Sequence, residues 1–128
     1  MPSPYKKDAQ NKGFLRFTHT IRYSINGVKA AWKYEESFRQ ELLLAMILIP
    51  LGIYLGNGAV EKLLLSGSIF FVLIVELINS AVETTVDRIS GEYHELSGRA
   101  KDIASAAVLG SIIVALATWS ALLIPRFV

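Results

Sequence analysis

Residues 76–102 read ELINSAVETTVDRISGEYHELSGRAKD, and this stretch decides the fold because an apolar helix pattern here carries carboxylates into a polar connection. Glu76, Asn79, Glu83 and Asp87 recur every three or four residues, so on a helix their side chains project from one face. A carboxylate near the centre of a bilayer costs about 2.5–3.5 kcal/mol, so such residues usually line a protein interior or carry function. The pattern therefore predicts a membrane helix with a functional acidic face.

The overall composition and the length of three apolar segments indicate that the chain is a membrane protein. Its 128 residues are 52% hydrophobic with a mean hydropathy of +0.42, which is typical of membrane proteins rather than soluble domains. Crossing ~30 Å of hydrocarbon takes ~20 helical residues. We expect spans at about 42–60, 63–82 and 103–124, with a kink at Pro50, a turn at Asn57 and Gly58, and a helix that continues past the second span to about Ile89.

The segment before the first span has a different pattern. Residues 1–12 contain two prolines and several charges, which predicts a flexible tail. From residue 14 to about 40, apolar side chains recur every three or four residues among basic ones, as in an amphipathic helix lying on a membrane surface. The predicted fold is therefore a single all-α domain over residues 1–128, with a surface helix and three transmembrane helices.

The distribution of basic residues predicts the orientation. Eight of the thirteen Lys and Arg residues precede the first apolar segment, whereas Lys62 and Arg126 lie at the predicted opposite side. Since basic residues favour the cytoplasmic side, the amino terminus is expected there. No signal peptide is visible, and without cysteine the sequence offers no disulfide, thiolate nucleophile or Cys-based metal site.

The polar residues gather at one depth, the cytoplasmic interface. Carboxylates in such number suggest Mg²⁺, which takes oxygen ligands and commonly binds one or two carboxylates beside substrate phosphates. Basic side chains such as Lys101 and Arg16 could neutralise phosphate oxygens, so the set suits phosphoryl transfer. Familiar nucleotide motifs, including G-x-x-x-x-G-K-S/T and G-x-G-x-x-G, are absent from the sequence. From physics alone the chain is a small membrane protein with an acidic site suited to a metal ion.

Structural explanations compete with these roles. Charged residues at the membrane edge, such as Glu83, are by default solvated, and Glu76 could form a buried ion pair between helices. Lys101 and Asp102 could simply mark the start of the third span. Trp119, like the other interfacial aromatic residues, fits an anchor better than a substrate contact.

The polar strings closely resemble those of the prokaryotic diacylglycerol kinase family, small membrane enzymes that phosphorylate diacylglycerol with ATP. The resemblance covers about residues 13–124 and includes three-span topology. It is carried by E-x-x-N-S-A-x-E-x-x-x-D-R from Glu76, by EYHELSGRAKD from Glu92, and by KAAWKYEESFRQE before the first span.

The resemblance implies roles for individual residues. Glu76 would be the general base with Asn79 beside it, and Glu35 and Glu83 would hold Mg²⁺ at the ATP phosphates. Nucleotide contacts would come from Arg16, Tyr23, Glu35, Glu83, Glu92, Tyr93, His94, Lys101 and Asp102. Lipid contacts would come from Ser24, Lys29, Glu41, Glu76, Ser105 and Trp119.

The resemblance further implies a homotrimer in the bacterial inner membrane, with active sites shared between neighbouring chains. Small residues along the third span, including Ala106 and Gly110, suit close helix packing. Glu35 precedes the first span whereas Glu76 lies on the second, and the resemblance implies that these two side chains come from different chains. The expected partners are diacylglycerol, ATP and membrane lipids, with no nucleic acid.

Two alternatives remain open at this stage. The related undecaprenol kinases use the same catalytic strings on a polyprenol, and sequence separates the two acceptors weakly. A small proton-coupled transporter could also have a single glutamate within a membrane span, and Glu76 occupies such a position in this sequence. Such a transporter has no use for the polar cluster GEYHELSGRAKD that follows.

Overall fold

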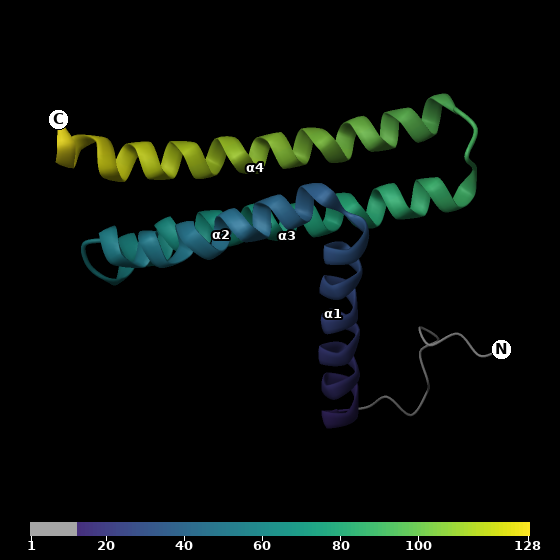
Figure 1. The fold of residues 1–128 in the computed structure, drawn as a ribbon, viewed down its shortest axis with the longest axis horizontal. Helices are drawn as coiled ribbons and strands as arrows, with labels where there is room; N and C mark the ends of the chain where they lie inside the picture. Colours follow the sequence, from purple (N-terminus) through teal and green to yellow (C-terminus); the bar gives the residue numbers. More distant parts are fainter. Residues whose placement is uncertain (1–12) are drawn as a thin grey trace.

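Four α-helices joined by short connections form the fold (Figure 1). This computed structural model describes residues 13–128, and the flexible tail predicted for residues 1–12 lies outside them. The helices are α1 (Phe14–Tyr34), α2 (Glu36–Leu55), α3 (Ala59–Ile89) and α4 (Glu95–Phe127). No strand occurs between residues 13 and 128, which confirms the predicted all-α class.

Three of the four helices are long and apolar enough to cross a membrane, namely α2, α3 and α4 with 20, 31 and 33 residues. Helix α3 is central and packs against both α2 and α4, whereas the described parts of α2 and α4 have no backbone contact with each other. Large apolar side chains such as Ile47, Phe70 and Leu109 stay exposed on the outer faces. Lipid tails are as apolar as these side chains, so this exposure suits a multi-pass membrane protein.

An elbow at Glu35 divides the segment for which we expected one surface helix over 14–40. Glu35 has extended backbone angles (φ −117°, ψ 105°), so α1 and α2 are separate helices. Arg39 Nη1 donates to the carbonyl oxygens of Trp32 (2.8 Å) and Lys33 (3.1 Å), which have lost their helical partners. Helix α1 therefore runs across the direction of the other three helices, as a helix lying on a membrane surface would (Figure 1).

The helix bounds differ from the predicted spans: α2 ends at Leu55 rather than at about 60, whereas α3 and α4 are longer than the spans predicted for them. Helix α3 runs to Ile89 as expected, but α4 already begins at Glu95, because His94 caps its first turn by accepting from the backbone N–H of Leu96 at 3.0 Å. Helix α4 also continues through Pro125, where a proline near the helix end removes only one hydrogen bond. The polar connection is thus shorter, and more of its residues are helical, than the sequence indicated.

Basic side chains hold the turn between α2 and α3. Gly58 adopts φ +88°, a left-handed conformation that favours glycine, in the predicted turn. Lys62 Nζ donates to the carbonyl oxygen of Ile53 (2.6 Å), and Arg126 Nη1 donates to that of Leu55. These are carbonyl groups at the end of α2 that lack helical partners, so cations from α3 and α4 satisfy them and tie the outer ends of the helices together.

Candidate functional site

Four carboxyl groups lie in the region where the elbow approaches α3, near enough to influence one another electrostatically. Glu76 is only 4% exposed on α3 and contacts the carboxyl group of Glu41 from α2. Glu35 at the elbow and Glu83 on α3 lie close enough to act on Glu76 electrostatically. The structure therefore gathers Glu35, Glu76 and Glu83 within one chain, and the sequence-based expectation that Glu35 and Glu76 come from different chains is not needed to explain the cluster.

Polar oxygen atoms beside this cluster lack partners. Asn79 Nδ2 lies 3.3 Å from Glu83 Oε1, which fixes the amide. Asn79 Oδ1, Ser80 Oγ and Glu41 Oε2 are buried without a hydrogen-bond partner. A buried polar atom left unpaired costs about 1–3 kcal/mol, so these atoms indicate a place where a donor group or a cation is missing.

The donor set fits a magnesium ion shared with phosphates. Within residues 13–128, no three His, Asp or Glu side chains are grouped so as to hold a metal ion unaided. Mg²⁺ commonly takes only one or two carboxylates and completes its shell with phosphate and water oxygens. Partial burial raises the pKa of Glu35, and the negative charges of Glu83 and Asp87 raise it further. A cation between Glu35 and Glu83 would relieve this repulsion.

A hollow of about 240 Å³ lies at the connection between α3 and α4 and brings together several of the predicted nucleotide residues. Lys101 Nζ is held 2.8 Å from Asp87 Oδ1, which joins the two helices at this hollow. His94 Nδ1 accepts the Leu96 N–H, so its Nε2 carries the proton and can donate. The predicted nucleotide residues that line the hollow are Glu92, Tyr93, His94 and Lys101.

Asp87 and Ser80 are site residues to which the sequence gave no role. Asp87 was part of the acidic face, and the structure makes it the partner of Lys101. Its signal was the spacing of four residues after Glu83. Ser80 gave no sequence signal, because a serine on a membrane helix usually bonds to its own backbone.

Other predicted residues lie away from these groups. Arg16 is near the free end of α1, which points away from the α3–α4 connection of the same chain (Figure 1). Tyr23 stacks on His19 with 6.2 Å between ring centroids, also on α1. Asp102 lines a second hollow with Tyr93. Of the remaining predicted lipid residues, Ser24 lines a hollow between α1 and α3 that Glu35 and Ser80 also line, whereas Lys29 and Ser105 are exposed.

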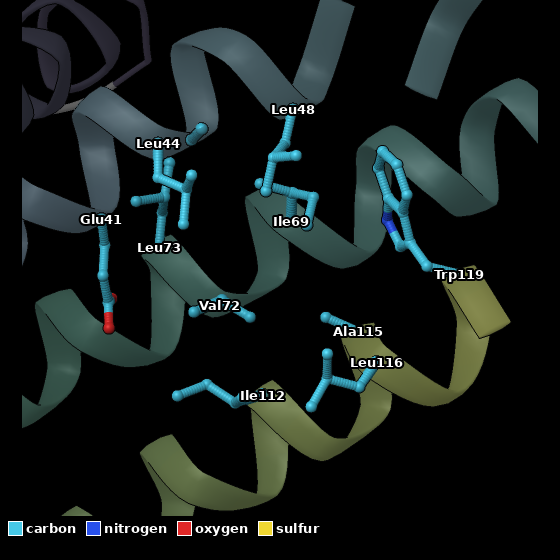
Figure 2. A pocket seen from close by; sticks show the side chains of 11 residues that line it. Glu41, Leu44, Leu48, Ile69, Val72, Leu73, Ile112, Ala115, Leu116 and Trp119 are labelled. Atoms are coloured by element: carbon cyan, nitrogen blue, oxygen red, sulfur yellow. The ribbon is translucent and has the colours of Figure 1, made fainter. Parts of the chain in front are cut away.

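An apolar groove of about 370 Å³ runs over α3 between α2 and α4, and it joins two predicted lipid residues. Figure 2 shows Glu41 at one end of the groove and Trp119 at the other, with aliphatic side chains between them. Trp119 Nε1 donates to the carbonyl oxygen of Leu65 at 3.0 Å. The indole thus bonds to α3 among the helices, whereas its role as a membrane-interface anchor, which the sequence favoured, stays a prediction.

Known proteins are similar to this chain over most of its length. The sequence profile of the family described as prokaryotic diacylglycerol kinase matches residues 22–123. The protein named diacylglycerol kinase from Escherichia coli strain K12 is 49% identical over 115 residues, which cover 90% of this chain and 94% of that protein. The protein of the same name from Haemophilus influenzae is 46% identical, with 87% of this chain and 94% of the relative covered.

A more distant relative extends the match along nearly the whole chain. The diacylglycerol kinase of Pseudomonas aeruginosa is 42% identical over 123 residues, which cover 96% of this chain and 98% of the relative. Profile and relatives together span the elbow, the acidic face of α3 and the α3–α4 connection. The chain therefore belongs to the prokaryotic diacylglycerol kinase family.

Proposed function

We propose that this chain transfers the γ-phosphoryl group of ATP to the primary hydroxyl of diacylglycerol and so forms phosphatidic acid. The observation that carries the proposal is the position of Glu76, which is buried beside Glu41 at the mouth of an apolar groove and faces Glu35 and Glu83. An apolar acceptor and a highly charged donor can meet only where such surfaces adjoin. Family membership supports a kinase that uses ATP.

In this mechanism Glu76 accepts the proton of the acceptor hydroxyl while the hydroxyl oxygen attacks the γ-phosphorus in line. The bond from the γ-phosphorus to its bridging oxygen breaks, and ADP leaves with that oxygen. Once Glu76 has taken that proton, Asn79 Oδ1 and Glu41 Oε2, which are buried without partners, are available to accept a hydrogen bond from its carboxylic acid. A base aligned in this way contributes by position and by proton transfer in the same step.

Charge on the phosphates would be balanced from the α3–α4 connection. Lys101, held by Asp87, presents its ammonium group at the hollow, and His94 offers its Nε2–H there. Glu35 and Glu83 would hold Mg²⁺, which when bound neutralises phosphate charge. The carboxylates themselves keep the phosphates away from the elbow unless that cation is present.

The same assignment implies an orientation in the bacterial inner membrane. Helix α1 would lie on the cytoplasmic surface, and ATP would reach the α3–α4 connection from the cytoplasm. Lys62 and Arg126 would then lie at the outer surface, where they hold the end of α2. The excess of basic residues before α2 supports this direction.

We infer a homotrimer whose sites are completed by a neighbouring chain. Support comes from α1, the helix that carries Arg16 and Tyr23, because its free end points away from the α3–α4 connection of its own chain (Figure 1). The exposed small residues Ser105 and Ala106 on α4 permit the close helix approach that such an assembly requires.

Phosphate transfer from radiolabelled ATP tests the proposal. The purified protein in lipid nanodiscs is offered diacylglycerol or undecaprenol, and the labelled lipids are separated by chromatography. We expect label in phosphatidic acid. Label in the polyprenyl product alone would assign the protein to the undecaprenol kinases, and no label in either lipid would favour a transport role for Glu76.

A further inference from the structure

We propose that Trp119 and Gly52 form the end stop of a slot for one acyl chain of the lipid substrate, and so set how the enzyme discriminates chain lengths. The proposal rests on the proposed lipid kinase function and adds to it a specificity determinant. It concerns the groove between α2 and α4 (Figure 2). Its occupant is a substrate acyl chain rather than bulk lipid or a second copy of the protein.

The groove is continuous with the candidate catalytic centre. Glu41 lines its inner end, and the same carboxyl group contacts Glu76. A glycerol hydroxyl placed between these carboxyl groups would therefore direct an attached acyl chain along α3. The lining beyond Glu41 is aliphatic, and rim residues such as Leu44 and Leu116 are more than half exposed, so a chain can enter sideways from the bilayer.

The groove has a defined outer end because Trp119 crosses it. Helices α2 and α4 make no backbone contact within residues 13–128, so only a long side chain can bridge them over α3. Trp119 starts on α4, donates its indole N–H to Leu65 O of α3 and brings its ring up to Gly52 of α2. From Glu41 to Leu48 the helical rise gives the groove a length of about 10 Å before this barrier.

Gly52 is what allows the ring to reach α2. A Cβ atom at this position would lie 3.2 Å from Trp119 Cζ2 and 3.0 Å from Leu65 Cβ. Both separations are tighter than ordinary packing, so a methyl group there would press on the indole and on Leu65 at the outer end of the slot. The two residues therefore predict opposite effects: removal of the indole lengthens the slot, and a side chain at Gly52 shortens it.

The length of the slot can be measured from phosphoryl-transfer rates with diacylglycerols of increasing acyl-chain length. For diacylglycerols from dihexanoyl to dioleoyl, kcat/KM should rise by up to about fourfold per buried methylene and level off at the chain that reaches Trp119. In Trp119→Ala the plateau should begin at a longer chain, and in Gly52→Ala at a shorter one. Ile113→Ala, a truncation on the exposed face of α4, is the matched control and should leave the plateau in place.

A binding measurement covers the case in which a variant folds poorly. The chain has two tryptophans, so Trp32→Phe leaves Trp119 as the only tryptophan, which excitation at the long-wavelength edge of the indole absorption selects over the five tyrosines. Diacylglycerols brominated at successive acyl carbons should quench Trp119 most strongly at one depth, in the absence of ATP. Phospholipids brominated at the same carbons should quench it several-fold less.

Different results would refute the proposed end stop and the proposed lipid kinase function. A wild-type protein that phosphorylates no diacylglycerol of any length would refute the proposed function. Transfer with a plateau that stays at the same chain length in Trp119→Ala and Gly52→Ala would overturn the end stop alone. Equal quenching by brominated substrate and brominated phospholipid, or none by either, would show bulk lipid or another chain in the groove and would also overturn it.

Discussion

Replacement of Glu76 by glutamine is the sharpest test of the candidate site. Glutamine keeps the volume and shape of the side chain but removes the proton acceptor. A positioned general base contributes about 10²- to 10⁴-fold to rate, equivalent to roughly 2.7–5.4 kcal/mol of activation barrier. Glu76→Gln should therefore lower kcat by this factor at saturating ATP and lipid.

Folding should survive this change because of the surroundings of Glu76. The side chain is 4% exposed beside other carboxyl groups, so a neutral isostere removes a source of repulsion without leaving a cavity. Circular dichroism and size-exclusion chromatography should match those of the wild type.

The assay is transfer of radiolabelled phosphate in nanodiscs, with Glu36→Gln as the matched control. Glu36 is exposed in the first turn of α2 and has no role in the proposed chemistry, so its variant should retain wild-type kcat. A Glu76→Gln protein that keeps more than about a tenth of wild-type activity would refute the base assignment.

Three further predictions address the metal, the nucleotide and the assembly. Partial burial and the neighbouring charges raise the pKa of Glu35, so its carboxylate gains a proton at a higher pH than an ordinary glutamate, and the Mg²⁺ concentration that gives half-maximal activity should rise as pH falls through that raised pKa. Glu35→Gln should weaken Mg²⁺ use and flatten this pH profile, whereas an unchanged profile would remove Glu35 from the metal site. Asp87→Asn should raise KM for ATP several-fold more than KM for lipid, because Lys101 loses the partner 2.8 Å away that positions it; equal effects on both KM values would indicate a general structural role. When differently tagged chains are dissociated and reassembled together, a mixture of Arg16→Ala and Glu76→Gln should regain activity well above either variant alone. A mixture of Glu35→Ala and Glu76→Gln should not, since those carboxylates belong to one chain's cluster. Recovery in the Glu35 mixture but not in the Arg16 mixture would reverse this assignment.

The sequence alone determined the fold class and the helix face on which the acidic residues lie. The spacing of Glu76, Asn79, Glu83 and Asp87 predicted one acidic helix face, and α3 carries these residues as a continuous helix to Ile89. Such features depend on local periodicity and on the length of apolar runs, which are readable without tertiary contacts. The family followed from long polar strings, and the profile match confirms it.

Helix ends were less predictable because they depend on single contacts. The elbow at Glu35 requires Arg39 to satisfy carbonyl groups several residues earlier, and the early start of α4 depends on the cap supplied by His94. Neither contact has a periodic signal in the sequence. Each is a side chain reaching backbone groups whose position depends on the turn itself.

Relations between distant segments were decided only by the tertiary structure. That Glu35 and Glu41 both approach Glu76 follows from the angle at the elbow, which composition does not encode. Trp119 looked like an interfacial anchor, yet 54 residues separate it from its hydrogen-bond partner Leu65, and only the packing of α4 on α3 brings the two together. Sequence patterns report which face of a helix is apolar or acidic; which faces meet, and which groove they enclose, depends on how the helices pack.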